Sequence, residues 1–281
     1  MKRIGIIAKK NEPETLKAVE KFITGLRQRD CEIFLEEEIA SSLSLKGTEL
    51  HKIPETSDVI VVFGGDGTLL SVARLVGNQG VPILGINLGG LGFITELNRD
   101  EVDANLEMLF SESYCYEERI MLLANVYRNG EKMIEQNALN DVVLNKSALS
   151  RMFYLDLHIS GHYATSLRAD GLIVSTPTGS TAHSLSAGGP ILYPTLESFL
   201  ITPICPHTLT SRPIVLPDSV SLDVIITSGT DVYLTIDGQV GFPLQEKDKI
   251  VIHKAEYKTK FIVLQDRDYF RILRKKLKWG E

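Results

Sequence analysis

Residues 58–68 read Asp-Val-Ile-Val-Val-Phe-Gly-Gly-Asp-Gly-Thr, and this stretch decides the fold of the first part of the chain. The apolar run predicts a buried parallel strand, and the glycines after it predict a tight turn into a helix over 68–76. In open α/β sheets, ligands bind at the carboxyl ends of the strands. Glycines let a phosphate approach the backbone and amides at a helix start attract anions, so the stretch predicts a phosphate site.

Asp66 is the unusual residue of this turn. A carboxylate among phosphate-binding amides is electrostatically unfavourable unless it has a task, such as holding a magnesium ion or accepting a proton from an attacking hydroxyl. The alternative is structural, with Asp66 capping the following helix. The sequence contains no G-x-x-x-x-G-K-S/T, and Ala8 and Lys10 stand where a dinucleotide fingerprint after Gly5 would need glycines. We therefore favour a functional Asp66 outside both of these enzyme classes.

The segments around this stretch alternate between strand and helix patterns. Further strands and helices are predicted over 3–8, 13–29, 32–35, 81–86 and 100–110. Such alternation is typical of a parallel sheet with helices on both faces. A second glycine-rich loop over 87–92 follows the last strand at the same edge, and by itself it is equally compatible with a tight connection.

The pattern changes near Tyr116. From there to about Leu264, short alternating or β-branched runs dominate, and turn signals such as Asp237-Gly238 separate them. We expect an α/β domain over 1–116, an all-β antiparallel domain over 117–264 and a C-terminal helix within 265–281.

The tail over 269–279 reads as a basic helix. Phe270, Leu273 and Leu277 are expected to form one apolar face that docks on the α/β domain, with the cations in solvent. The alternative is that the cations bind anionic lipid.

Two polar clusters interrupt the β-rich part. Residues 175–182 read Ser-Thr-Pro-Thr-Gly-Ser-Thr-Ala, and they either contact a ligand with phosphates or sugar hydroxyls or form a polar loop with a capped helix. Asn140 and Asp141 lie inside an apolar strand predicted over 138–144. A carboxylate there can accept both hydroxyls of a ribose, and an amide can hydrogen-bond an adenine edge; the alternative is a strand bulge.

Composition and charge narrow the possible classes. The 281 residues carry 30 Lys and Arg against 36 Asp and Glu, a net charge of −6, which argues against a general nucleic-acid binder. The three cysteines lie far apart without C-x-x-C, so we expect neither a disulfide framework nor a zinc knuckle, and a reducing cytosol. Lys9 and Lys10 cut the apolar start short, and no run approaches the roughly 20 apolar residues of a spanning helix. These features predict a soluble, cytoplasmic protein.

Taken in order, the segments FGGDGT, NLGGLGF, LNDVV, RADGLIVSTPTGSTAHSLSAGGPI, PHTLTSRP and DGQ resemble the bacterial NAD kinases of the ATP-NAD kinase family over most of the chain. GGDGT alone is shared with diacylglycerol-type lipid kinases and phosphofructokinases. The resemblance implies a Rossmann-like α/β domain, an all-β, sandwich-like domain, and a chain end that returns to the first domain. It also implies that ATP, with a divalent metal such as Mg²⁺, phosphorylates the 2′-hydroxyl of the adenosine ribose of NAD to give NADP, in a homodimer or homotetramer.

The resemblance also assigns functional residues. Asp66 matches the catalytic aspartate, which would orient the hydroxyl and accept its proton. The NAD-binding positions that it matches are Asp66, Gly67, Asn140, Asp141, Arg151, Arg168, Asp170, Thr181, Ala182, His183, Ser184, Leu185, Ser186 and Gln239. Asp141 stands where the family usually has glutamate, and His183 where it usually has tyrosine. No dedicated metal ligands are expected, because magnesium can arrive bound to the triphosphate.

Arg168 belongs to the region that faces the nicotinamide end of NAD in the family. A guanidinium held by an acid such as Asp170, or by a neighbouring subunit, would form a wall for the flat oxidised ring, so we expect NAD to be preferred over NADH. Two other functions stay open: a lipid kinase of the diacylglycerol type and a non-catalytic NAD or NADP sensor. The missing apolar surface segment argues against the first, and the carboxylate of Asp66 argues against the second.

Overall fold

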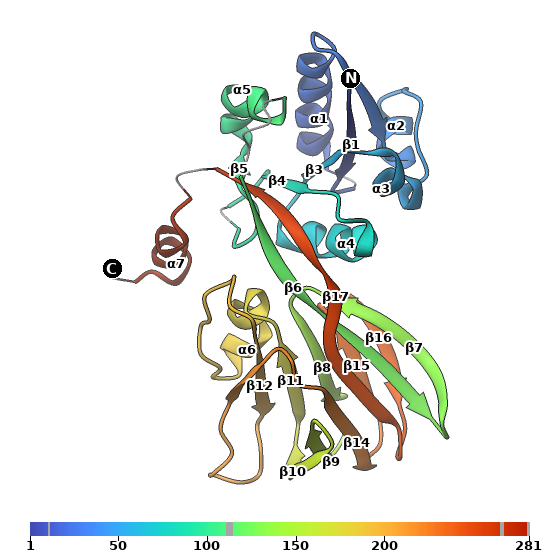
Figure 1. Cartoon of the computed structure of the whole chain (residues 1–281), viewed down its shortest axis with the longest axis vertical. Coiled ribbons are helices and arrows are strands. Elements are labelled where there is room, and N and C mark those ends of the chain that lie inside the picture. The colour runs from blue at the N-terminus through green and yellow to red at the C-terminus, as the bar shows by residue number, and fades with distance from the viewer. Residues whose placement is uncertain (11, 91, 111–114, 265–266, 280–281) are drawn as a thin grey trace. The chain divides into compact units, whose positions relative to one another are not determined.

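The computed structural model describes residues 1–10, 12–90, 92–110, 115–264 and 267–279. It divides into two compact units, which we treat separately (Figure 1). The first unit holds Met1–Glu118 and Thr259–Glu281, and the second holds Arg119–Lys258. Two long strands, β6 (Cys115–Arg128) and β17 (Lys249–Val263), have residues in both units. Among the described residues, no helix is long and apolar enough to cross a membrane.

Strands and helices alternate along the first unit. Its other elements are β1 (Lys2–Ala8), α1 (Pro13–Leu26), β2 (Cys31–Leu35), α2 (Glu37–Ser42), α3 (Ile53–Thr56), β3 (Val59–Phe63), α4 (Asp66–Val76), β4 (Ile83–Asn87), β5 (Leu97–Asn98), α5 (Val102–Asn105) and α7 (Tyr269–Leu277). The strands follow the order β17-β4-β3-β1-β2, and each neighbouring pair is parallel. The predicted α/β class with a parallel sheet is confirmed.

Helices cover both faces of this sheet. On one face, Ile4 and Ile6 of β1 share a buried cluster with Phe22 of α1. On the opposite face, a Cβ on Gly5 would lie 2.5 Å from the hydroxyl of Ser57, so α3 and its C-terminal flank can pack this closely only against a glycine. Alternate strand residues therefore serve two different helical layers.

Strand register gathers three loops at one edge of the sheet. Ala8 of β1 lies opposite Phe63 of β3, and Phe63 lies opposite Ile86 of β4. Because the strands are parallel, the segments that begin at Lys9, Gly64 and Asn87 emerge side by side at the carboxyl edge. Residue 91 of the third loop lies outside the described residues.

The second unit consists almost entirely of antiparallel strands. Its other elements are β7 (Glu131–Ala138), β8 (Asp141–Lys146), β9 (Phe153–Ile159), β10 (His162–Ala169), β11 (Gly171–Ser175), α6 (His183–Ser186), β12 (Ser198–Ile204), β13 (Ile214–Pro217), β14 (Leu222–Ser228), β15 (Val232–Ile236) and β16 (Val240–Leu244). One sheet has the order β13-β12-β11-β8-β15-β16, and the strands β10-β9-β14-β17 form the other layer. One buried cluster contains residues of both layers, including Leu144 and Val224, so the predicted all-β domain with a sandwich-like core is confirmed.

Three local predictions were wrong. The strand predicted over 138–144 is interrupted at residues 139 and 140, for a reason given below. The helix predicted over 100–110 is only the short α5, with 3₁₀ turns on both sides. In α7 the buried side chains are Tyr269, Ile272 and Leu273, whereas Phe270 is exposed, so the apolar face is rotated from the predicted one.

Candidate functional site

The carboxylate of Asp66 is held by a neighbouring loop. Gly65 is the N-cap of α4 and Asp66 is its first residue, so Asp66 is not the helix cap of the structural alternative. Its Oδ2 accepts the N–H of Phe93 at 2.9 Å, and its Oδ1 accepts the N–H of Ile94 at 3.2 Å. Two fixed donors therefore set the direction of the carboxylate at the carboxyl edge of the parallel sheet.

Glycines make this arrangement possible. A Cβ on Gly92 would lie 2.2 Å from Oδ1 of Asp66, so only glycine lets the loop approach the carboxylate. A Cβ on Gly65 would meet nothing within 4 Å, so the turn before α4 is open to a ligand. Asn87 stabilises the facing loop, because its Oδ1 accepts the N–H of Gly89 at 2.9 Å and its Nδ2 donates to the hydroxyl of Thr95 at 3.1 Å.

A hollow of about 480 Å³ lies over this turn. Two lysines line it, Lys9 just after β1 and Lys276 from α7, together with the carboxylates of Glu12 and Asp66 and both glycine-rich loops. The ammonium of Lys276 lies 5.7 Å from the centre of the Phe93 ring, and Lys9 pairs with Glu12. Because Glu12 pairs with Lys9, the groups of this hollow that favour an anion such as a phosphate are the backbone amides at the start of α4 and Lys276.

In the second unit, Asp237 organises a polar corner. Its Oδ1 accepts the N–H of Asn140 at 2.8 Å and of Asp141 at 3.1 Å, and its Oδ2 accepts that of Leu139 at 3.2 Å. Because these three consecutive amides donate to the carboxylate of Asp237 and not to a neighbouring strand, the strand predicted over 138–144 is interrupted. Asp237 is also the turn residue after β15, at φ 49°, as the hairpin prediction requires.

Asp141 and His183 form the second feature of this corner. Asp141 is 1% exposed, and both of its carboxylate oxygens lie 3.2 Å from Nδ1 of His183. The hydrogen bond to Asp141 and the negative charges of Asp141 and Asp237 raise the pKa of His183 above its ordinary value, although partial burial opposes this. The two residues that depart from the pattern of the family that the sequence resembles thus contact each other.

The hydroxyl-rich segment before α6 packs directly on the same corner. A Cβ on Gly179 would lie 2.1 Å from the carbonyl oxygen of Asn140, and the N–H of Thr176 donates to that oxygen at 2.9 Å. Ser184 is buried and bonds the hydroxyl of Thr202 at 2.8 Å, so it faces the interior. A hollow of about 600 Å³ lies beside the corner, lined in part by His183 and Ser186.

The structure places the remaining predicted positions as follows. Gly67 is exposed in α4, whereas Thr181, Ala182 and Leu185 are half-buried in the segment that leads into and through α6. Gln239 is exposed after the Asp237 turn, and Arg151 is exposed before β9.

An acid such as Asp170, or a neighbouring subunit, was suggested to hold Arg168. Instead, the guanidinium of Arg168 lies 5.6 Å from the centre of the Tyr154 ring, and the carboxylate of Asp170 lies 3.7 Å from the ammonium of Lys146. The suggestion that Asp170 holds Arg168 was therefore wrong. An aromatic ring is an equally good platform for a planar cation.

The sequence did not predict several residues that position the candidate site residues. The amides of Phe93 and Ile94 carry no side-chain signal, because any residue can donate from its backbone. The role of Asp237 depends on the pairing of β8 with β15, whose partners, such as Leu234 and Leu144, lie about 90 residues apart in the chain, so no local pattern reveals it. Among the described residues, no group of three or more His, Cys, Asp or Glu could hold a metal ion.

Two protein-family models match the sequence. The ATP-NAD kinase N-terminal domain matches residues 4–114, and the ATP-NAD kinase C-terminal domain matches residues 139–264. The chain is 48% identical over 282 residues to the NAD kinase of Geobacter metallireducens and 47% identical over 283 residues to that of Geotalea daltonii. In both cases the match covers 100% of each chain.

Two solved structures are similar to the whole chain. Yeast NADH kinase complexed with NADH has a TM-score of 0.94 at 29% identity, and the match covers 100% of this chain and 89% of the other. An NAD kinase from Archaeoglobus fulgidus in complex with ATP has a TM-score of 0.78 at 25% identity, and the match covers 98% of both chains.

Proposed function

The chain belongs to the ATP-NAD kinase family and forms NADP from NAD and ATP, and we propose that Asp66 is the residue that accepts the proton of the reacting hydroxyl. The observation that carries the proposal is the pair of amides of Phe93 and Ile94 that orients this carboxylate beside the glycine turn. Family membership over the full length of the chain also removes the lipid-kinase and sensor alternatives.

The proposed chemistry follows from the properties of a carboxylate. An alcohol is far less acidic than a carboxylic acid, so Asp66 does not hold a free alkoxide before the reaction. It orients the 2′-hydroxyl of the adenosine ribose and accepts the proton as the bond to phosphorus forms. Phosphoryl transfer depends mostly on positioning and charge neutralisation, which the amides at the start of α4 and the nearby lysines supply.

We assign NAD binding to the polar corner of the second unit. Asn140 supplies an amide for the adenine edge, and Asp141 supplies a carboxylate for the ribose hydroxyls. The other proposed contacts are Gly67, Arg151, Arg168, Asp170, Thr181, Ala182, His183, Ser184, Leu185, Ser186 and Gln239. The buried Ser184 acts by shaping the segment, since its hydroxyl is already bonded to Thr202. Arg168 on Tyr154 remains our proposed wall for the oxidised nicotinamide ring, with NAD preferred over NADH.

The residues present fit a magnesium ion that is carried by ATP. The described part of the chain has no cluster of acidic, histidine and cysteine ligands, so the triphosphate would supply most of the ligands. Such an ion, when bound, neutralises charge on the phosphates. We also propose a homodimer or homotetramer in a reducing cytoplasm, consistent with three free cysteines.

Asp66→Asn tests the proposed role. The amide keeps the size of the side chain but cannot accept the proton, so we expect turnover to fall roughly 100-fold or more while NAD binding changes within a few-fold. NADP formation by the purified protein with ATP, Mg²⁺ and NAD measures turnover, and isothermal titration measures NAD binding. Asp30→Asn, at a carboxylate whose side chain is 85% exposed, is the matched control. Near-normal turnover of the Asp66 variant would remove the assignment.

A further inference from the structure

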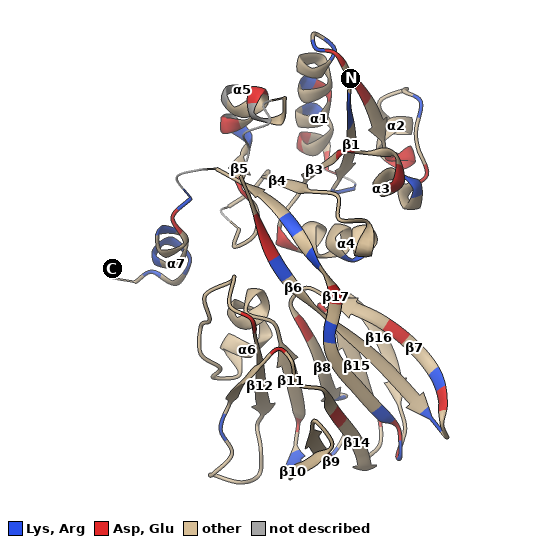
Figure 2. Cartoon of the chain, viewed as in Figure 1, with Lys and Arg blue, Asp and Glu red and all other residues tan. Residues whose placement is uncertain are grey.

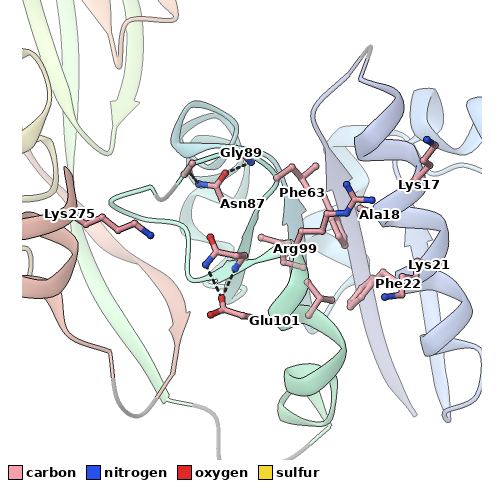
Figure 3. Close-up of a pocket in the computed structure, with 15 residues that line it drawn as sticks. Lys17, Ala18, Lys21, Phe22, Phe63, Asn87, Gly89, Arg99, Glu101 and Lys275 are labelled. Atoms are coloured by element: carbon pink, nitrogen blue, oxygen red, sulfur yellow. Dashed lines mark hydrogen bonds between the residues drawn. The ribbon is translucent and has the colours of Figure 1, made fainter.

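The loop between β4 and β5 carries the two amides that hold the proposed proton acceptor. Near the start of this loop, Oδ1 of Asn87 accepts the N–H of Gly89 at 2.9 Å (Figure 3). Just beyond its end, Oε2 of Glu101 accepts the backbone N–H of Asn98 at 2.8 Å, as part of a capping box (Figure 3). The two amides lie between these fixed points, so the direction of the carboxylate depends on what holds the middle of the loop.

Arg267, just before α7, holds the middle of this loop. Its Nη2 donates to the carbonyl oxygen of Phe93 at 2.9 Å. That carbonyl and the N–H of Ile94 belong to one planar peptide group, and this N–H donates to Oδ1 of Asp66 at 3.2 Å. The same peptide therefore joins the guanidinium on one side to the carboxylate of Asp66 on the other.

A buried ion pair directs this guanidinium. Nη1 of Arg267 lies 2.9 Å from Oε2 of Glu96, and the two side chains are only 7% and 5% exposed. Oε1 of Glu96 accepts the N–H of Leu264 at 2.8 Å, and the N–H of Glu96 donates to the carbonyl oxygen of Gly85 in β4 at 3.0 Å. Glu96 thus connects the segment that follows β17 to the parallel sheet, and it fixes Arg267 beside the loop.

The attachment of α7 does not by itself explain a buried ion pair. The helix already buries Tyr269, Ile272 and Leu273, and its own cations, which Figure 2 shows in blue, are exposed. Apolar residues of similar volume often stabilise a fold as well as a buried ion pair does, because burying two charges is costly. A guanidinium can instead bond two acceptors at fixed angles, and a charged donor at a carbonyl oxygen polarises the peptide and strengthens its N–H as a donor. These properties favour a role in orienting the loop.

We propose that Arg267 is a positioning residue for the phosphoryl transfer. It acts through the peptide of Phe93 and Ile94 and keeps the carboxylate of Asp66 directed at the hydroxyl whose proton it accepts, and Glu96 keeps the guanidinium in place. The segment before α7 therefore contributes to turnover and not to the affinity for either substrate. The inference rests on the proposed function, because Arg267 acts through the proposed proton acceptor.

Arg267→Lys tests the proposal. A lysine can still pair with Glu96, so the buried charge keeps a partner, but its single nitrogen lacks the fork that also bonds Phe93. We expect kcat to fall about tenfold, while the KM for NAD and the KM for ATP stay within about twofold, because a displaced base slows the chemical step. Arg274→Lys is the matched control, since Arg274 pairs with Asp268 at 3.2 Å and its side chain is 56% exposed. A kcat of Arg267→Lys equal to that of the control overturns the proposal.

Glu96→Gln is a second test that leaves Arg267 in place. The amide oxygen can still accept the N–H of Leu264, but the neutral side chain attracts the guanidinium less, so we expect a smaller fall in kcat with both KM values unchanged. Glu49→Gln is its control, because Glu49 pairs with Lys52 and is 46% exposed. Urea denaturation of all four variants shows that they are folded under the assay conditions. An unchanged kcat in both Arg267→Lys and Glu96→Gln contradicts the positioning role.

The Asp66→Asn background separates positioning from a general structural loss. If Arg267 acts through Asp66, adding Arg267→Lys to Asp66→Asn should lower the remaining turnover by less than about twofold, because residues that act as a unit are not additive. A tenfold loss in both backgrounds overturns the proposal. Near-normal turnover of Asp66→Asn alone would remove the proton-acceptor role, whereas low turnover of Asp66→Asn with normal turnover of Arg267→Lys would remove only the role of Arg267.

Discussion

The first unit and the second unit build their polar sites in different ways. In the first, Asp66 lies at the edge of a parallel sheet, and the groups that hold it are backbone amides of the loop that follows the adjacent strand. In the second, the corner at 139–141 depends on a carboxylate from a distant hairpin and an imidazole from α6. A contiguous motif therefore predicts the first site, whereas strand pairing assembles the second.

Gly92→Ala should disrupt the loop that orients Asp66, and we expect it to have the largest effect on turnover among the variants that test this comparison. The new Cβ would lie 2.2 Å from Oδ1 of Asp66 and 2.3 Å from the hydroxyl of Thr95, so the loop must move and its amides must leave the carboxylate. A misdirected base should lower turnover about as much as its removal in Asp66→Asn does, roughly 100-fold. The rate of NADP formation at saturating NAD and ATP measures this.

The matched control for Gly92 is Gly241→Ala, whose Cβ would meet nothing within 4 Å. It should leave turnover unchanged within about twofold, because a strand alanine without a clash changes stability by only some tenths of a kcal/mol to 1 kcal/mol. If Gly92→Ala retained full turnover, the loop would not orient Asp66.

Asp237→Ala should damage the second arrangement through stability. Three backbone amides lose their acceptor, and buried unsatisfied donors are costly, so we expect a loss of about 3 kcal/mol in the free energy of unfolding. Urea denaturation measures it. Asp231→Ala is the control, because Asp231 is also a turn aspartate with positive φ, at 54°, but is exposed. Equal losses in both variants would mean that the turn conformation, not the amide contacts, matters.

Asp141→Ala should weaken the binding of NAD more than it destabilises the fold. Its carboxylate is the proposed ribose acceptor, and a lost charged hydrogen bond corresponds to about 1.5–3 kcal/mol of binding free energy. Isothermal titration with NAD measures the change. Asp156→Ala provides a comparison, since Asp156 of β9 accepts a hydrogen bond from Ser166 of β10 and is not part of the polar corner. Unchanged NAD affinity would mean that Asp141 does not bind NAD and that residues 140 and 141 belong only to an interrupted strand.

The same contrast explains what the sequence could predict. The strand before Gly64 and its turn were predictable because apolar periodicity and glycines act locally. The interruption at Asn140 was not predictable, because it depends on Asp237. The hairpin pattern around Asp237 predicts a turn, but it does not predict that this carboxylate accepts hydrogen bonds from backbone amides. The apolar face of α7 was predicted only in part, because Leu273 is buried as expected, but Tyr269 and Ile272 are buried as well and Phe270 is exposed. A nine-residue helix offers too few turns to fix its phase from spacing alone.

The smallest expected effect concerns the pH dependence contributed by His183. Asp141 raises the pKa of His183 in the folded protein, so the protonated ring is favoured by folding. This contribution to stability is fully present below the ordinary histidine pKa near 6.5 and is lost as the pH rises through the raised value. The unfolding free energy of the wild type should therefore fall relative to that of His183→Gln as the pH rises above the ordinary histidine pKa, as measured by urea denaturation. The difference should be small, because the His183 side chain is 57% exposed and solvent screens the pair. His162→Gln, at an exposed histidine of β10, should keep the pH dependence of the wild type. If His183→Gln keeps it as well, protonation of the imidazole beside Asp141 does not contribute to the stability of the fold.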